Sequence, residues 1–449
     1  MHTRYVLALL ALIGTAALVL GLLWVLGLQA RVAEVEAFCR DEPTSRVCNG
    51  QPDTGSPSPG DSSAAPPSAS PGAPSASADP GDPALGGAVW LPPQVDAAAS
   101  VIIAAPNSAD TGKERADVVV EGTADDEINA AFRELASIGG GQVTLLEGRF
   151  ELSAPVVIDG DGMALVGVNV GNGAGYAEEA LGSQLVPADS FPDGEFLVRA
   201  TGDAYGTLVS LVHLDGLDRA QGLNIEGKRP TISLNAVTQS ADVGMRFAGE
   251  STGNRPYDGF VLFNRIFDGA GIGILHDERS GDMLIEGNVV FRNGGDGFRC
   301  FGASQMYRVN HAYENDGVGL RIIPGCVRTR LSSNKWEGNA QGGVSIEGGS
   351  GFTIIGDTFA HNEAGADGAQ AHLQIGVRGD DRTTGVLAWG LAFGKGDDDN
   401  PYLVHVGSRA RDVHIGPMSS AGGFTREPVL VDGGGEVEFY DPVAEPITD

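Results

Sequence analysis

The sequence predicts an all-β solenoid, in which the chain winds into stacked coils of short strands, over residues 100–449. Three observations predict this fold class. An asparagine or aspartate recurs about every 23 residues, with spacings of 24, 22, 24 and 23, at Asn264, Asn288, Asn310, Asn334 and Asp357. Nine residues after each asparagine comes a glycine followed by an apolar residue, at Gly273-Ile274, Gly297-Phe298, Gly319-Leu320 and Gly343-Val344. A second asparagine lies five residues after most anchors, at Asn293, Asn315, Asn339 and Asn362. A unit this short leaves no room for a long helix, so each repeat is expected to form one coil of strands and tight turns.

The repeated asparagines are expected to be structural. Stacked coils place identical side chains about 4.8 Å apart, the spacing between neighbouring strands, so the amides can bond to their own copies above and below. Asparagine also tolerates left-handed backbone, and glycine suits a position where the chain bends sharply. We therefore interpret the asparagine columns as a scaffold ladder rather than as catalytic groups.

The N-terminal residues do not follow the repeat. Residues 6–28 form an uncharged apolar run of 23 residues, about 35 Å long as a helix and so long enough to cross a bilayer. A signal peptide has a shorter apolar core, so we expect an uncleaved single-pass transmembrane helix. Residues 1–5 are the expected cytoplasmic tail, because Arg4 lies on the short side. The predicted localisation is the cell membrane, with the folded domain extracytoplasmic.

Between this anchor and the solenoid we expect a juxtamembrane segment, residues 29–50, and a disordered linker, residues 51–99. Nine prolines lie between Pro52 and Pro83, among serine, alanine, glycine and aspartate. Such a composition cannot form a core and is typical of an extended spacer.

The cysteines and the acidic runs leave several alternatives open. Cys39 and Cys48 can close a small loop if their compartment is oxidising. Cys300 and Cys326 lie in neighbouring coils at different registers, so a second disulfide is open but not implied. No cysteine pair has zinc spacing, and we expect no zinc site. One acidic run offers oxygen ligands for calcium, with a solvated turn as the alternative, at Asp397-Asp398-Asp399-Asn400.

The charge of the chain narrows the classes of partner. The formal net charge is −30, which repels nucleic acid and anionic lipid. We therefore expect no nucleic-acid partner, and the composition does not indicate an oligomeric state.

A short helix is expected before the first coil. Thr123 can cap a helix in which Ile128, Phe132 and Leu135 share one face, and three glycines at 139–141 end it. Strands are expected to follow at residues 142–146 and 155–158. Such a helix would cover the open apolar end that a solenoid otherwise exposes.

This start of the domain resembles the N-terminal cap of the pectate-lyase-like superfamily of right-handed parallel β-helices. The matching segments are Asp125-Asp126, Gly140-Gly141-Gln142-Val143, Gly148-Arg149-Phe150 and Leu152-Ser153. The resemblance extends over residues 115–380 and implies a right-handed parallel β-helix with an N-terminal capping helix. Leu146-Glu147 departs from the proline context of the family, and the motifs of polygalacturonases and pectate lyases are absent. The resemblance therefore implies a fold and a polysaccharide-related role rather than a particular reaction.

Alternation along one strand of each repeat predicts an outward row of side chains. Counting from each asparagine, positions 10 and 12 are expected to point inward, and positions 11 and 13 outward. Position 11 carries Arg246, Leu275, Arg299, Arg321 and Ser345, and position 13 includes Asp277, Phe301 and Glu347. Neighbouring arginines repel each other unless an anion lies between them. The row is either a groove for an acidic or heavily hydroxylated glycan, or a set of ion pairs with acids such as Asp296, Glu314 or Asp316.

These observations lead to one functional hypothesis and one alternative. We expect a membrane-anchored β-helix protein that acts on a polysaccharide or cell-envelope glycan as a lyase, hydrolase or epimerase. The candidate catalytic residues are Asp277, His276, Arg299 and Arg321, and the candidate substrate-binding residues are Arg246, Arg299, Arg321 and Glu347. His276 falls on an inward position, which favours a place in the core, and His311 follows a ladder asparagine as a turn residue would. The alternative is a non-catalytic glycan-binding or cell-envelope structural module.

Overall fold

A computed structural model describes residues 99–171, 182–249, 255–362, 371–394, 402–420 and 429–440. The expected anchor and linker, the Cys39–Cys48 pair and the acidic run at 397–400 lie outside the described residues. Among the residues that are described, no helix is long and apolar enough to cross a membrane.

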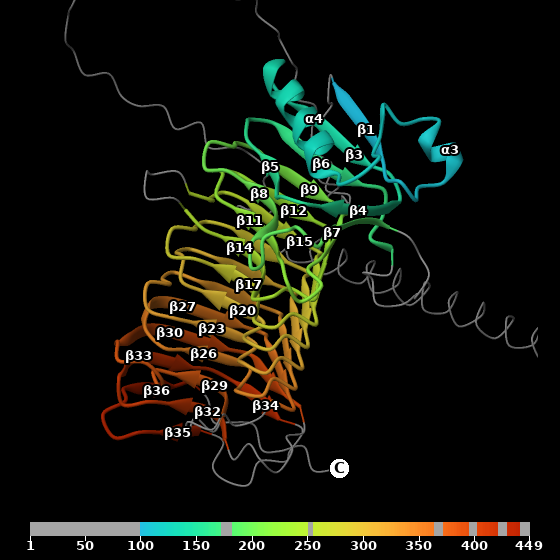
Figure 1. Ribbon diagram of the computed structural model, residues 1–449. Helices are drawn as coiled ribbons and strands as arrows, with labels where there is room; N and C mark the ends of the chain where they lie inside the picture. The colour runs from blue at the N-terminus through green and yellow to red at the C-terminus, as the bar shows by residue number, and fades with distance from the viewer. Residues whose placement is uncertain are drawn as a thin grey trace, which may run out of the picture. The chain divides into compact units, whose positions relative to one another are not determined.

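The described chain is a parallel β-solenoid built of three sheets (Figure 1). Each coil contributes one strand to each sheet, and every pairing between strands is parallel, for example β15 with β18 and β16 with β19. The predicted all-β parallel solenoid is thus confirmed.

Sheet A has fourteen strands and includes the first strands of the domain. In spatial order its strands are β2 (Val118–Val119), β1 (Ser100–Ala104), β3 (Gly141–Leu145), β6 (Met163–Gly167), β9 (Leu208–Ser210), β12 (Thr231–Ser233), β15 (Phe260–Leu262), β18 (Leu284–Glu286), β21 (Met306–Arg308), β24 (Arg330–Ser332), β27 (Gly349–Ile355), β30 (Thr383–Trp389), β33 (Ala410–Ile415) and β36 (Val437–Phe439).

Sheet B follows sheet A in each coil and has eleven strands. They are β4 (Gly148–Leu152), β7 (Ser183–Pro187), β10 (His213–Asp215), β13 (Ala236–Thr238), β16 (Arg265–Phe267), β19 (Val289–Phe291), β22 (His311–Tyr313), β25 (Lys335–Glu337), β28 (Thr358–Ala360), β31 (Leu391–Phe393) and β34 (Met418–Ser420).

Sheet C completes each coil and also has eleven strands. They are β5 (Val156–Ile158), β8 (Phe196–Ala200), β11 (Gln221–Ile225), β14 (Val243–Phe247), β17 (Ile272–His276), β20 (Phe298–Cys300), β23 (Leu320–Ile322), β26 (Val344–Ile346), β29 (Ala371–Ile375), β32 (Tyr402–Val406) and β35 (Val429–Val431).

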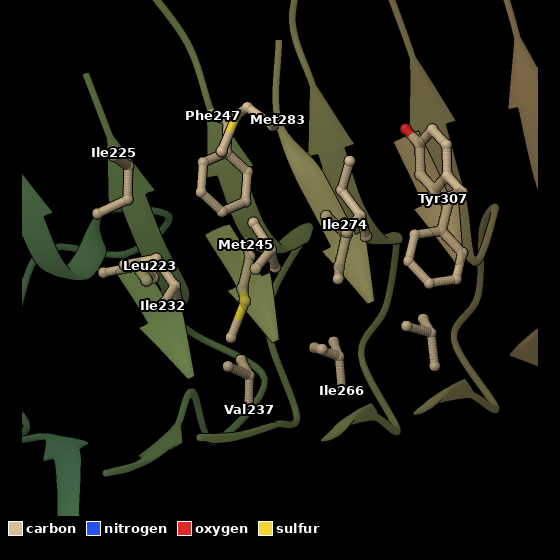
Figure 2. Close-up of a cluster of buried hydrophobic side chains, with 14 of the residues drawn as sticks. Leu223, Ile225, Ile232, Val237, Met245, Phe247, Ile266, Ile274, Met283 and Tyr307 are labelled. Atoms are coloured by element: carbon tan, nitrogen blue, oxygen red, sulfur yellow. The ribbon is translucent and has the colours of Figure 1, made fainter. Parts of the chain in front are cut away.

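The core runs along the inside of the three sheets. Apolar side chains at equivalent positions stack coil upon coil, as Leu223, Met245 and Ile274 do in sheet C. Figure 2 shows these residues facing Ile232 of sheet A and Val237 of sheet B across the interior. Burying each such side chain stabilises the fold by about 1.5–3 kcal/mol, so the regular inward positions supply most of the stabilisation.

The asparagine ladder is confirmed and lies at the corner between sheets A and B. Asn264 Nδ2 donates to Asn288 Oδ1 (2.9 Å), and Asn288 Nδ2 donates to Asn310 Oδ1 (3.0 Å). The column continues through Asn334 to Asp357. The second set of asparagines forms another such column at the corner between sheets B and C, with Asn293 to Asn315, Asn315 to Asn339 and Asn339 to Asn362.

One reason given for the repeated asparagines and one given for the repeated glycines were wrong. The left-handed residue is the one before each ladder asparagine, as at Phe263 (φ 54°) and Val309 (φ 53°), while the asparagine itself points inward and bonds. The repeated glycines do not adopt left-handed backbone. A Cβ at Gly273 would lie 2.2 Å from Val290 Cγ1 and 2.6 Å from the Gly297 carbonyl oxygen, so glycine is required there by close packing.

The N-terminal helix is present with the expected buried face. Helix α4 (Asp125–Ser137) packs against β3 and β5 at the first coils, and a short helix, α3 (Asp110–Lys113), precedes it (Figure 1). Ile128, Phe132 and Leu135 are buried, as predicted. Thr123 does not cap the helix; its hydroxyl instead bonds Ser153. Asp125 accepts hydrogen bonds from the backbone and hydroxyl of Ser153, which ties the helix to the coil beneath it.

A disulfide joins Cys300 to Cys326, both fully buried. The sequence left this bridge open, because the two cysteines occupy different registers of neighbouring coils. The bridge closes a stretch of 26 residues across one coil.

Candidate functional site

The predicted outward row exists on the outer face of sheet C. Arg246 lies beside Leu275, Leu275 beside Arg299, Arg299 beside Arg321, and Arg321 beside Ser345 in the register of β14, β17, β20, β23 and β26. The inward neighbours of these residues are buried, such as Ile274 and Phe298. The alternation predicted from the asparagine period is therefore confirmed.

The two adjacent arginines share one carboxylate. Arg299 donates from Nε (2.7 Å) and Nη2 (2.6 Å) to Asp296 Oδ2, and Arg321 Nε donates to the same oxygen (2.9 Å). The side chain of Asp296 is only 2% exposed, and its other oxygen accepts the backbone N–H of Val318 (3.0 Å). A buried carboxylate between two guanidinium groups removes the repulsion that neighbouring arginines would otherwise have.

Arg321 is held by three acceptors. Besides Asp296, its Nη1 donates to Glu347 Oε1 (2.6 Å) and its Nη2 to Gln341 Oε1 (3.2 Å). Arg378 Nη1 donates to the same Gln341 oxygen (3.2 Å). Burial works to lower the pKa of Arg321, but Asp296 and Glu347 outweigh it and raise that pKa. Arg321 is therefore a fixed, permanently charged part of the face.

In the two preceding coils, an arginine and a carboxylate of the same face form a more exposed ion pair. Arg246 Nη2 donates to Asp277 Oδ2 (2.7 Å), and the other oxygen of Asp277 accepts the backbone N–H of Glu278 (2.8 Å). Arg299 is 34% exposed, and its Nη1 takes part in none of the contacts with Asp296. The expectation that acids pair with the arginines is thus confirmed for Asp296, while Glu314 and Asp316 do not supply the partners of Arg299 and Arg321.

His276 is not at the surface, and its assignment as a catalytic residue is corrected. The imidazole is fully buried, stacks on Phe247 at 4.9 Å between ring centroids, and meets the edge of Tyr307. Both ring nitrogens are buried without a hydrogen-bond partner in the described part of the chain. Burial lowers the pKa of His276 to about 3, so the ring is neutral. A neutral core histidine cannot exchange a proton with a substrate on the outer face.

Sequence reasoning missed the continuation of the row. Gln374 and His405 extend it beyond Ser345, and Asn224 extends it before Arg246. All three are buried although they lie on the outer side of the sheet. Asn224 precedes the first anchor, Gln374 lies 17 rather than 11 residues after Asp357, and the coil of His405 has no such anchor, so the count did not reach these positions.

A second polar cluster lies on the outer face of sheet B. His311 Nε2 lies 3.1 Å from Glu337 Oε2, and Lys335 Nζ lies 2.6 Å from the same oxygen. Burial lowers the pKa of His311 more than Glu337 raises it, and the Lys335 contact lowers the pKa of Glu337. Beside the cluster, Tyr313 ends a stack of aromatic rings that begins with Phe267 and Phe291. His311 is the first residue of β22, so it lies in a strand rather than in a turn.

No group of three or more histidine, cysteine, aspartate or glutamate side chains within the described ranges is arranged to hold a metal ion. The acidic run at 397–400, the earlier calcium candidate, lies outside those ranges.

Comparison with known proteins supports the fold. Residues 209–359 match the family described as a right handed beta helix region. Sequence comparison with curated proteins gives no match. The A-module of a mannuronan C-5 epimerase from Azotobacter vinelandii is similar in structure, with a TM-score of 0.50 and 14% identity, over 73% of this chain and 96% of that one. DFA-IIIase from Arthrobacter chlorophenolicus A6, in complex with GF2, has a TM-score of 0.53 and 13% identity, over 70% and 90% of the two chains. The resemblance to right-handed parallel β-helix proteins is confirmed, and identities this low show the fold alone.

Proposed function

We propose that the protein binds a polysaccharide along the outer face of sheet C. The observation that supports this most directly is the row of arginines and carboxylates in register, fixed by short ion pairs and still partly open to solvent. Such a row presents donors and acceptors at the regular spacing of the strands, which suits a repeating ligand. The name of the epimerase neighbour also refers to a polysaccharide, mannuronan.

The ion pairs favour a hydroxyl-rich, uncharged glycan over an acidic one. Each of Arg246, Arg299 and Arg321 already bonds to a carboxylate, so little positive charge remains for an anionic ligand. The whole chain carries −30, which repels a polyanion. Sugar hydroxyls both donate and accept, and alternating guanidinium and carboxylate groups can satisfy both functions.

A binding role fits this face better than a catalytic one. A reacting acid or base must reach the substrate atom that takes or gives the proton. The partly exposed carboxylate of Asp277 and the largely buried one of Glu347 already accept short hydrogen bonds from arginines, and His276 lies in the core. Lysis, hydrolysis or epimerisation with Asp277, Arg299 and Arg321 as catalytic groups is the second candidate function, favoured by the epimerase likeness in fold.

We further propose that the solenoid lies outside the cytoplasm, anchored by residues 6–28. The Cys300–Cys326 bridge supports this location, because structural disulfides form in oxidising compartments. Protease added to intact cells should remove the solenoid and leave the anchor in the membrane fraction. Protection of the solenoid from protease would contradict the proposed topology.

Binding is tested with the full-length protein and a panel of purified polysaccharides. Neutral chains such as galactan and xyloglucan are compared with mannuronan and polygalacturonate by affinity electrophoresis and calorimetry. Arg246→Ala combined with Arg299→Ala should weaken binding of a neutral chain about tenfold or more, which corresponds to about 1.4 kcal/mol. Arg292→Ala, which removes an equally short ion pair with Asp268 elsewhere on the surface, serves as the matched control and should bind like the parent.

Two outcomes decide between the proposals. A folded double variant that binds as tightly as the parent would place the glycan elsewhere. New reducing ends, or the ultraviolet absorbance of unsaturated uronates, appearing with the parent and lost in Asp277→Asn, would establish the catalytic candidate instead of the binding one.

A further inference from the structure

An exposed aromatic and aliphatic patch lies on the outer face of sheet A, in its last coils. Ile355, Leu387, Trp389 and Tyr440 are each 37–45% exposed. They come from β27, β30 and the end of β36 and lie side by side, because Ile355 pairs with Trp389 and Leu387 pairs with His414 of β33. We call Ile355, Leu387, Trp389 and Tyr440 the Trp389 patch.

The indole of Trp389 lies flat on the sheet. A Cβ on Gly416 would lie 2.2, 2.5 and 2.8 Å from three carbons of this indole. Several ring atoms therefore pass over Gly416, which directly follows β33 and has no side chain to hold the ring away. The ring thus packs against backbone at Gly416 while Trp389 remains 40% exposed. The sequence provides a planar apolar platform rather than a scattered surface hydrophobe.

Fixed polar groups border the platform. Tyr440 lies 6.2 Å from Trp389 and 5.5 Å from His414 between ring centroids. His414 Nε2 lies 2.8 Å from Asp412 Oδ1, and His414 Nδ1 lies 3.1 Å from Tyr440 Oη and 3.3 Å from Glu438 Oε2. Both imidazole nitrogens are thus engaged, and the Tyr440 hydroxyl is held in place near the indole.

We propose that the Trp389 patch is a binding subsite for a pyranose ring of a neutral glycan. One side of a pyranose with equatorial hydroxyls consists of C–H groups, which can lie on the exposed indole face, while the hydroxyls at its rim point sideways. Tyr440, the polar residue next to Trp389, offers a hydroxyl at that rim, and His414, itself in contact with Asp412 and Glu438, holds this hydroxyl. This combination of an apolar platform and convergent polar groups is typical of small-molecule sites.

The size and charge of the patch argue against a protein as the occupant. A stable protein interface buries about 800 Å² on each partner and excludes charge from its centre. Here four partly exposed apolar side chains adjoin two carboxylates. A single sugar ring needs only the area of one indole.

The site does not depend on the face of sheet C, because no residue is shared between them. Glycan binding at one face can therefore be lost while binding at the other remains. The Arg246 and Arg299 double variant should keep any response at Trp389.

The test is a titration of the full-length protein, kept in a detergent without a sugar headgroup, with cellopentaose. Binding should change the tryptophan fluorescence and be detectable by calorimetry. Trp389→Ala should weaken the affinity roughly tenfold or more, as truncation of a central aromatic anchor does, and Trp389→Phe should weaken it less because a smaller ring remains. Val309→Ala, at an exposed apolar corner position just after β21 and outside the patch, is the matched control and should behave as the parent.

Three results would overturn the proposal. They are no binding by the parent at millimolar cellopentaose, equal binding by folded Trp389→Ala, or a parent dimer in light scattering that Trp389→Asp dissociates. The last result would assign the patch to contact between two copies of the chain.

Discussion

Replacing Asn310 by leucine is expected to destabilise the solenoid, and the structure sets the magnitude. Asn310 Nδ2 donates to the Ile285 carbonyl (2.8 Å) and to Asn334 Oδ1 (3.0 Å). Its Oδ1 accepts the backbone N–H and the Nδ2 of Asn288, both at 3.0 Å. Leucine removes all four hydrogen bonds and leaves the buried N–H of Asn288 without this acceptor. At about 1 kcal/mol for each bond, the free energy of unfolding should fall by about 4 kcal/mol.

The assay is urea denaturation followed by tryptophan fluorescence in a background where the other three tryptophans are phenylalanine, so that the signal comes from Trp336, which is fully buried one coil further along the ladder. A local probe is preferable because long repeat proteins do not always unfold in one step. Asn169→Leu is the matched control, since Asn169 is exposed and makes only a local side-chain bond to the Gly171 N–H. It should cost less than about 0.5 kcal/mol. Equal midpoints for Asn310→Leu and Asn169→Leu would refute the ladder as a source of stability.

Three further predictions concern buried groups. His276→Phe should raise stability at neutral pH by about 1–3 kcal/mol, because it removes two unpaired ring nitrogens; it should also reduce the loss of stability that the parent shows as pH falls from 6.5 towards about 3. Burial raises the pKa of Asp357 to about 6, so the stability that protonated Asp357 contributes is complete below about pH 3.8 and is lost as pH rises through 6. The free energy of unfolding should therefore fall between pH 4 and 7, and Asp357→Asn should flatten this dependence. The amide would, however, leave Trp336 Nε1 without its acceptor. Replacing Cys300 and Cys326 by alanine should cost about 3 kcal/mol, as expected for a loop of 26 residues, and an unchanged denaturation midpoint would show that the bridge is dispensable.

The period made the coil corners and the outward row predictable. Once Asn288 and Asn310 are aligned, counting eleven residues places Arg299 beside Arg321, and the structure has that pairing. The period could not reveal which residue is left-handed. Phe263 and Val309 occupy those positions, and neither residue type indicates positive φ in a sequence.

The candidate sites depend on residues that the period does not reach. Asp296 could be predicted as a partner because it precedes Arg299 by three residues. Gln341 and Arg378 lie outside regular strands, and the fold alone brings Gln341 to Arg321 and Arg378 to Gln341. Apart from Ile355, the Trp389 patch lies after the last anchor, Asp357, where counting stops. Its platform depends on Gly416, whose role appears only when the neighbouring strand is placed.

Corner, inward and outward positions of each coil are under different structural constraints, and this difference indicates where a binding site can form. Corner positions are constrained by the ladders and inward positions by the continuous core, so substitutions such as Asn310→Leu carry a cost in stability. The outward position of sheet C has no such constraint, and it varies from Arg246 to Leu275 to Ser345 along the stack. Two consecutive coils nevertheless place arginines there and provide a buried carboxylate, Asp296, to hold both. Burying and pairing those charges brings little stability compared with apolar residues of similar size, which favours a role in recognition over one in folding.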